Sequence, residues 1–131
     1  MGADRAGRSC ECHSPALLAP THLIADVHCT EALEKADVVE AFSRQVISVT
    51  GLHVRHYHAE AFTNGSEFGP GITTMALLSE SHLVVHTAPE RGMLNVDLYS
   101  CRAFDAELVR GLIELHFAPD RWDYWEVLAR H

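Results

Sequence analysis

The chain has little positive charge, with ten Lys and Arg against eighteen Asp and Glu and a formal net charge of −8. Proteins that bind nucleic acid neutralise phosphates with Lys and Arg, so this balance argues against a nucleic-acid partner. No apolar run approaches the length of a membrane span, and the first residues lack the apolar core of a secretory signal. We therefore expect a cytoplasmic protein that makes no membrane contact.

Cysteine pairs with the spacing of a zinc motif are also missing. The segment Cys10-Glu11-Cys12-His13 is not a Cys-x-x-Cys pair and has no matching second pair, and the ten histidines follow no known zinc spacing. We expect no metal site, and free thiols at all four cysteines, which include Cys29 and Cys101, because a reducing compartment disfavours disulfides. The role of Cys10, Cys12 and His13 stays open.

Apolar residues are plentiful enough for one folded domain. The chain has 131 residues, and 47% of them are hydrophobic. Residues 1–20 mix Gly, Ser, Pro and charge without a period, which is typical of a flexible leader. We expect one domain over residues 21–131.

Periodic apolar patterns predict strands and helices in the order β-α-β-β-β-β-α-β. Strands are expected at 21–27, at 52–62, on both sides of the turn at 79–82, at 93–101 and at 122–128. Runs of adjacent strands favour an α+β two-layer sandwich, with an antiparallel sheet and two helices on one face. The other face would need cover, so we expect a homodimer.

The two expected helices each have an apolar stripe and a stop signal. The first spans 31–50 and ends at Gly51, and the second follows a cap at Asp105 and ends before Pro119. The stripe of the first helix is Val39, Phe42, Val46 and Val49, and that of the second is Leu108, Leu112 and Leu115.

The segment Ser79-Glu80-Ser81-His82 lies between two apolar runs, which is a hairpin signal. A serine in such a turn is placed to attack the carbonyl before it. Attack by the Ser81 hydroxyl on Glu80 would give an ester, elimination would leave dehydroalanine, and hydrolysis would leave a pyruvoyl group. His86, five residues later, is a candidate proton donor. Taken alone, however, a serine in a hairpin is most often only a turn former.

The turn is part of a longer sequence pattern. It reads Ser79-Glu80-Ser81-His82-Leu83, His86-Thr87, Pro89-Glu90, Gly92, Val96-Asp97-Leu98 and Cys101, without a gap. The pattern resembles the self-cleavage region of the prokaryotic S-adenosylmethionine decarboxylase proenzymes, and residues 21–26 resemble that family's first strand. The resemblance implies a pyruvoyl-dependent carboxy-lyase that forms decarboxylated S-adenosylmethionine for polyamine (spermidine) biosynthesis.

The resemblance also implies roles for individual residues. The chain would be cleaved between Glu80 and Ser81, and Ser81 would become the pyruvoyl cofactor that forms a Schiff base with a small-molecule substrate. His86 would be the processing acid. Cys101 would return a proton to the α-carbon after carbon dioxide leaves.

The remaining implied roles concern processing support and the substrate. Thr73 stands where the family has a processing serine, and Glu90 matches the carboxylate that holds the ribose hydroxyls. Phe68 is the candidate to stack on adenine, one residue out of register, because Ala88 replaces a family tryptophan. Glu67 adds an acid that suits a cationic substrate. Two alternatives therefore stay open: an ornithine or arginine decarboxylase on the same scaffold, and a non-catalytic binding protein.

Overall fold

The computed structural model describes residues 19–63 and 69–130. The elements follow one another in the predicted order. They are β1 (Thr21–His28), α1 (Ala36–Thr50), β2 (Val54–Phe62), β3 (Gly71–Leu78), β4 (Ser81–Ala88), the 3-10 helix η3 (Pro89–Arg91), β5 (Met93–Ser100), α2 (Ala106–Phe117) and β6 (Arg121–Ala129).

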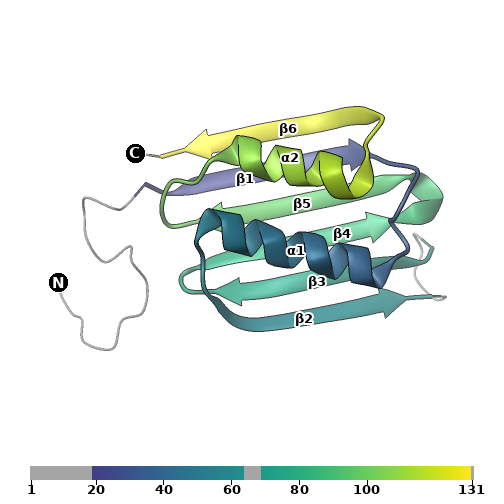
Figure 1. Cartoon of the computed structure of the whole chain (residues 1–131), viewed down its shortest axis with the longest axis horizontal. Helices are drawn as coiled ribbons and strands as arrows, with labels where there is room; N and C mark the ends of the chain where they lie inside the picture. The colour runs from purple at the N-terminus through teal and green to yellow at the C-terminus, as the bar shows by residue number, and fades with distance from the viewer. Residues whose placement is uncertain (1–18, 64–68, 131) are drawn as a thin grey trace.

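The six strands form one sheet in the order β2-β3-β4-β5-β1-β6, and every neighbouring pair is antiparallel. Both helices lie side by side on the same face of this sheet (Figure 1). The predicted two-layer α+β sandwich is confirmed. The second face, which we call the open face, carries no helix within the described part of the chain (Figure 1).

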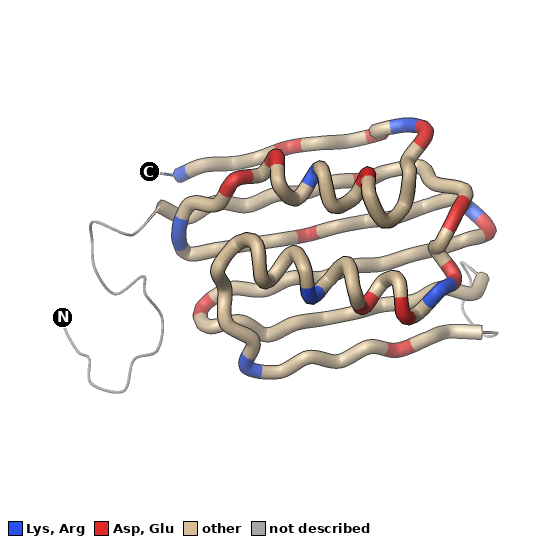
Figure 2. The backbone as a smooth tube through the Cα atoms, viewed as in Figure 1, with Lys and Arg blue, Asp and Glu red and all other residues tan. Residues whose placement is uncertain are grey.

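Buried and partly exposed residues alternate along the central strands, so one face of the sheet is apolar and the other is polar. In β1, Leu23, Ala25 and Val27 are buried under the helices, whereas His22 and Asp26 are half-buried on the open face. Side chains of a strand point to opposite faces in turn, so the polar residues of β1, β4 and β5 collect on the open face. Lys and Arg positions lie in the helices, in the turns and near strand ends (Figure 2).

The helix ends follow the predicted chemistry. Gly51 has a φ of 72°, and its N–H bonds to the carbonyls of Ile47 and Ser48, as expected of a left-handed C-cap. The Asp105 side chain accepts a hydrogen bond of 2.9 Å from the Glu107 N–H, which confirms the predicted N-cap. The first helix begins at Ala36 rather than at residue 31, because the residues before it form turns.

The predicted stripe of α1 is correct for three residues and wrong for the fourth. The side chains of Val39, Phe42 and Val46 have no exposed surface, but Val49 is 42% exposed and Ile47 packs in the core instead. A helical stripe can advance by three or four residues at each step. Here it continues from Val46 to Ile47 and Thr50.

The predicted stripe of α2 is wrong by one residue in phase. Leu108 and Leu115 are 48% and 73% exposed, and Leu112 is only partly buried. The buried residues are Val109, Ile113 and Phe117. Both sets repeat with a helical period, so periodicity alone did not distinguish them. The Phe117 ring settles the orientation, because it packs against the Phe42 ring of α1 at 5.3 Å between centroids.

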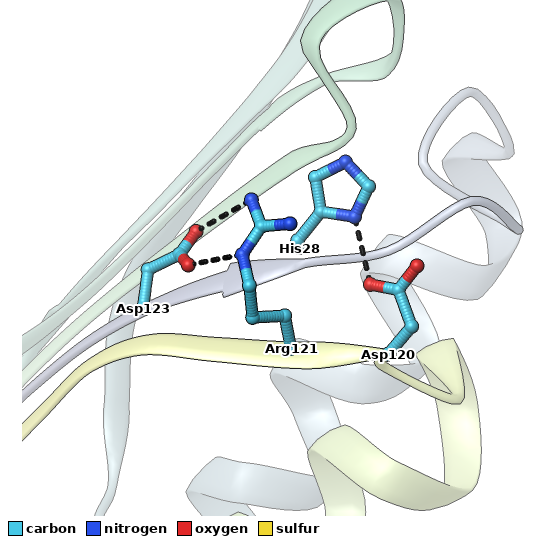
Figure 3. A network of polar contacts seen from close by, with 4 residues as sticks. All are labelled: His28, Asp120, Arg121 and Asp123. Atoms are coloured by element: carbon cyan, nitrogen blue, oxygen red, sulfur yellow. Dashed lines mark hydrogen bonds and ion pairs between the residues drawn. The ribbon is translucent and has the colours of Figure 1, made fainter.

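Polar contacts join the strands at the end of the sheet opposite the Ser79-Glu80 turn (Figure 3). His28 Nδ1 lies 2.7 Å from Asp120 Oδ1, and Arg121 bonds Asp123 through two nitrogens, at 2.5 and 3.3 Å. Gly92 lies against the His28 ring, and a Cβ there would sit 2.4 Å from Nε2. The close approach therefore requires glycine between η3 and β5.

The corrected phase of α2 predicts different costs for two substitutions in the same helix. Ile113→Ala should lower the free energy of unfolding by about 2–5 kcal/mol, because it opens a cavity in the core. Leu115→Ala should change it by less than about 0.5 kcal/mol, because that side chain is mostly exposed. Urea unfolding followed by circular dichroism measures both. Equal costs would contradict the assignment of the buried face.

Candidate active site

A two-residue turn, Ser79-Glu80, joins β3 to β4, with Leu78 paired to Ser81. Glu80 has a φ of 59°, and Ser79 is not among the residues with positive φ. The usual two-residue hairpin turns need positive φ at the first residue or at both. A side chain in the left-handed region costs roughly 1–2 kcal/mol. The backbone is therefore strained at the residue whose carbonyl Ser81 would attack.

The Ser81 hydroxyl is buried and held in place. Ser81 is 6% exposed, and its Oγ accepts a hydrogen bond of 3.1 Å from the Cys101 N–H. Ser81 begins β4, and Cys101 follows β5, the next strand in the sheet. The fold thus brings together two predicted site residues that lie twenty residues apart. A fixed N–H donor beside a reacting oxygen is the kind of group that stabilises developing negative charge.

The two cysteines in the described residues differ in state. Cys29 is a buried free thiol, and burial, together with the nearby Asp120 carboxylate, raises its pKa to about 11. Cys101 is disulfide-bonded. The expectation of free thiols is therefore confirmed for Cys29 and wrong for Cys101. A disulfide sulfur carries no proton, so Cys101 needs reduction before it can act as an acid.

The predicted processing pair Thr73 and His86 meets on the open face. Thr73 Oγ1 lies 2.9 Å from His86 Nδ1, because the two residues face each other in the pairing of β3 with β4. His86 and Ser81 are five residues apart on one strand, so their side chains point to opposite faces. At about 3.3 Å per residue they are separated by roughly 16 Å. Within one chain, His86 does not reach the Ser81 hydroxyl.

A hollow of about 200 Å³ adjoins the Thr73–His86 pair, and Ala88 lines it. The small Ala88 side chain leaves space where the family pattern has a tryptophan. Glu90 lies close to this hollow, because a Cβ on Gly69, another lining residue, would sit 2.5 Å from Glu90 Oε1. The predicted substrate residues Glu67 and Phe68 lie outside the described residues.

One polar cluster was not predicted from the sequence. The Asp97 carboxylate contacts His22 and His82 on the open face, and the three residues come from three different strands. His82 and Asp97 belong to the long pattern around the turn, and His22 lies in the segment that resembles the family's first strand, but no spacing among them predicts a contact. The sequence does place polar residues at alternate positions of otherwise apolar strands. This pattern predicts which sheet face they occupy, but not which residues of other strands they contact.

No helix in the described ranges has the length and apolar character needed to cross a membrane.

Comparison with known proteins supports the pattern over nearly the whole domain. Residues 21–130 match the family model described as S-adenosylmethionine decarboxylase. The S-adenosylmethionine decarboxylase proenzyme of Archaeoglobus fulgidus is 33% identical over 86 residues, which cover 61% of this chain and 69% of that protein. The proenzyme of Thermomicrobium roseum is 27% identical over 107 residues, which cover 81% and 89%. That of Caldanaerobacter subterraneus is 34% identical over 83 residues, which cover 61% of this chain and only 62% of the relative.

A solved structure shares the fold. The crystal structure of the adenosylmethionine decarboxylase from Aquifex aeolicus aligns with a TM-score of 0.68 and 25% identity, covering 87% of this chain and 91% of that one. The chain belongs to the S-adenosylmethionine decarboxylase family.

Proposed function

We propose that this chain is a self-processing, pyruvoyl-dependent decarboxylase of S-adenosylmethionine, acting in the cytoplasm and supplying polyamine biosynthesis. The observation that carries the proposal is the buried Ser81 hydroxyl, held by the Cys101 N–H beside the strained Glu80. The family match over residues 21–130 and the names of the curated relatives support the substrate.

The cleavage step follows from the turn. Ser81 Oγ attacks the carbonyl carbon of Glu80, and the Ser81 amide nitrogen leaves with a proton, so an ester replaces the peptide bond. Loss of the Ser81 α-proton then expels the Glu80 carboxylate and leaves dehydroalanine. Water releases ammonia from it, and a pyruvoyl group remains at position 81. The positive φ of Glu80 favours the first step, because opening the turn relieves that strain.

Ser81→Ala should abolish cleavage, because the attacking oxygen is gone. Intact mass spectrometry under denaturing conditions should show one full-length chain for this variant. The wild type should show two fragments, one of which ends at Glu80. Ser79→Ala is the matched control in the same turn and should still be cut. Uncut wild-type protein after prolonged incubation would refute the proposal and would leave a non-catalytic binding protein.

The positions of Ser81 and His86 call for a second copy of the chain. Met75 and Leu77 are 53% and 58% exposed on the open face, which gives that face apolar surface to bury. A two-fold axis near the middle of β4 would lay the His86 end of one protomer over the Glu80–Ser81 turn of the other, so that His86 would approach the Glu80–Ser81 peptide bond from the open face. We therefore propose a homodimer in which Ser81 and Cys101 of one protomer work with Thr73 and His86 of the second.

Complementation between two defective variants tests this shared site. Ser81→Ala and His86→Ala should each remain uncut when expressed alone. Co-expressed, they form a mixed dimer with one complete site, so the chain carrying His86→Ala should be cleaved. Differently tagged chains make the two distinguishable on a denaturing gel. Absence of cleavage in a mixed dimer confirmed by sedimentation would overturn the shared site, as would normal cleavage of His86→Ala alone.

After cleavage the pyruvoyl carbonyl would accept the electrons released when the substrate loses carbon dioxide. The chain's own part is to position the substrate and return a proton to its α-carbon. Cys101 is the candidate donor, because its backbone already lies at Ser81. Glu90 is the candidate partner for the ribose hydroxyls, beside the hollow that Ala88 lines.

Carbon dioxide release should be fastest from S-adenosylmethionine and should require a thiol reductant, because the oxidised Cys101 carries no proton. Cys101→Ser should still be cleaved but should lose about 10²–10⁴-fold in decarboxylation, the usual contribution of a positioned acid. Cys29→Ala is the control for loss of a buried thiol and should keep its activity.

Ala88 offers no aromatic ring to stack on adenine, which favours one alternative substrate class, the cationic amino acids ornithine and arginine. Faster release of carbon dioxide from either of them than from S-adenosylmethionine would overturn the proposed substrate and leave the cleavage chemistry intact. Normal turnover by Cys101→Ser would instead overturn the role of Cys101.

A further inference from the structure

Three side chains of metal-ligand type meet on the open face of the sheet. His22 belongs to β1, His82 to β4 and Asp97 to β5, the strand between the other two. We propose that they form a binding site for a divalent transition metal ion, best matched by zinc. The site is separate from the Ser81–Cys101 pair, which lies on the other side of the sheet.

The strand register produces the cluster. Tyr99 of β5 is paired with His22 on one side and with His82 on the other. Asp97 lies two residues along β5 on the same face, so it is the diagonal neighbour of both histidines. Its Oδ1 is 2.8 Å from His22 Nε2 and 3.2 Å from His82 Nε2. The three candidate ligand atoms all lie within 4.8 Å of one another.

The Tyr99 ring holds the two imidazoles in position. It stacks on His82 with 5.8 Å between ring centroids and meets the His22 ring edge-on at 5.9 Å. The His22 and His82 rings are themselves edge-on at 6.2 Å. A site whose ligands are already oriented loses little conformational entropy on binding an ion.

In a single chain the site is accessible, so an ion can bind before the proposed homodimer covers the open face. The side chains of His22, His82 and Asp97 are 29%, 45% and 44% exposed. Beside them an open hollow of about 450 Å³ is lined by His82 and Asp97 and extends to His86 and Asn95. An ion can enter from this hollow, and the same side offers room for water or another ligand.

The ligand set selects the class of ion. Two imidazole nitrogens and one carboxylate oxygen, with a fourth position open, match three-ligand zinc sites. Calcium and magnesium prefer all-oxygen shells and would bind poorly to two imidazoles. A neutral histidine that carries its hydrogen on Nδ1 has a lone pair on Nε2 that can bind the ion. In His22 and His82 this bond would replace the contact between Nε2 and Asp97 Oδ1.

The ion would tie together three neighbouring strands next to the cleavage point. His82 directly follows Ser81, so after a cut before Ser81 it would hold the new end of β4 against β5 and β1. This consequence rests on the proposed function, whereas metal binding itself does not. The same binding is therefore expected in Ser81→Ala, which stays uncut.

Zinc titration of the full-length, untagged chain tests the site. Cys10→Ser and Cys12→Ser form the background, because thiolates outside the described residues also bind zinc. Calorimetry should show one ion per chain, and cobalt should give visible absorption bands of a four- or five-coordinate site. Asp97→Asn and His82→Gln should each weaken binding at least tenfold. His56→Gln, an exposed histidine on edge strand β2, is the matched control and should not.

Thermal unfolding supplies a second measurement. Saturating zinc should raise the melting temperature of the background protein and of His56→Gln, because the ion binds the folded state. At the same zinc concentration the rise should be smaller in Asp97→Asn and His82→Gln, because they bind more weakly, with circular dichroism showing that both are folded. Equal zinc affinity in all variants, or no binding below millimolar zinc, would overturn the site. Binding in uncut Ser81→Ala separates this result from any failure of the proposed function.

Discussion

The antiparallel pairing of β4 with β5 is the constraint on which the site depends. Its register puts the start of β4 beside the residue that follows β5, and so places the Ser81 hydroxyl against the Cys101 N–H. The same register sets Tyr99 opposite His82 on the other face. A shift of one residue would exchange the two faces of a strand. Both chemistries thus depend on one alignment, which the buried residues Leu83 and Leu98 enforce.

That alignment also sets where the proposed catalytic residues lie within one chain. The hydroxyl and the proposed proton donor for decarboxylation lie at one end of β4, and His86 with Thr73 lies near the other, on the opposite face. A sheet with helices on one side does not bring one end of a strand onto the other. In the proposed homodimer, two sheets packed face to face would bring the two ends together and would also cover exposed apolar surface.

The sequence allowed the element order, the layer arrangement and both helix caps to be predicted, since each depends on local chemistry such as that of Gly51 and Asp105. The phase of α2 was not predictable from periodicity, because a leucine stripe and the stripe of Val109, Ile113 and Phe117 both repeat with a helical period. The contact of Phe117 with the other helix selects the second stripe. Local sequence patterns did not predict side-chain contacts between strands that are far apart in the sequence. The His22–Asp97 contact is one such case.

The strand order determines how the two fragments would be held together after cleavage at the turn. Residues up to 80 supply β1, β2 and β3, and the remainder supplies β4, β5 and β6, yet the sheet runs β2-β3-β4-β5-β1-β6. The strand β1 of the first fragment is inserted between two strands of the second, so the fragments would interlock and would not separate by sliding apart. Once denatured, however, they must find each other by diffusion. Recovery of the cut protein would then depend on its concentration, whereas the uncut chain folds as a single molecule.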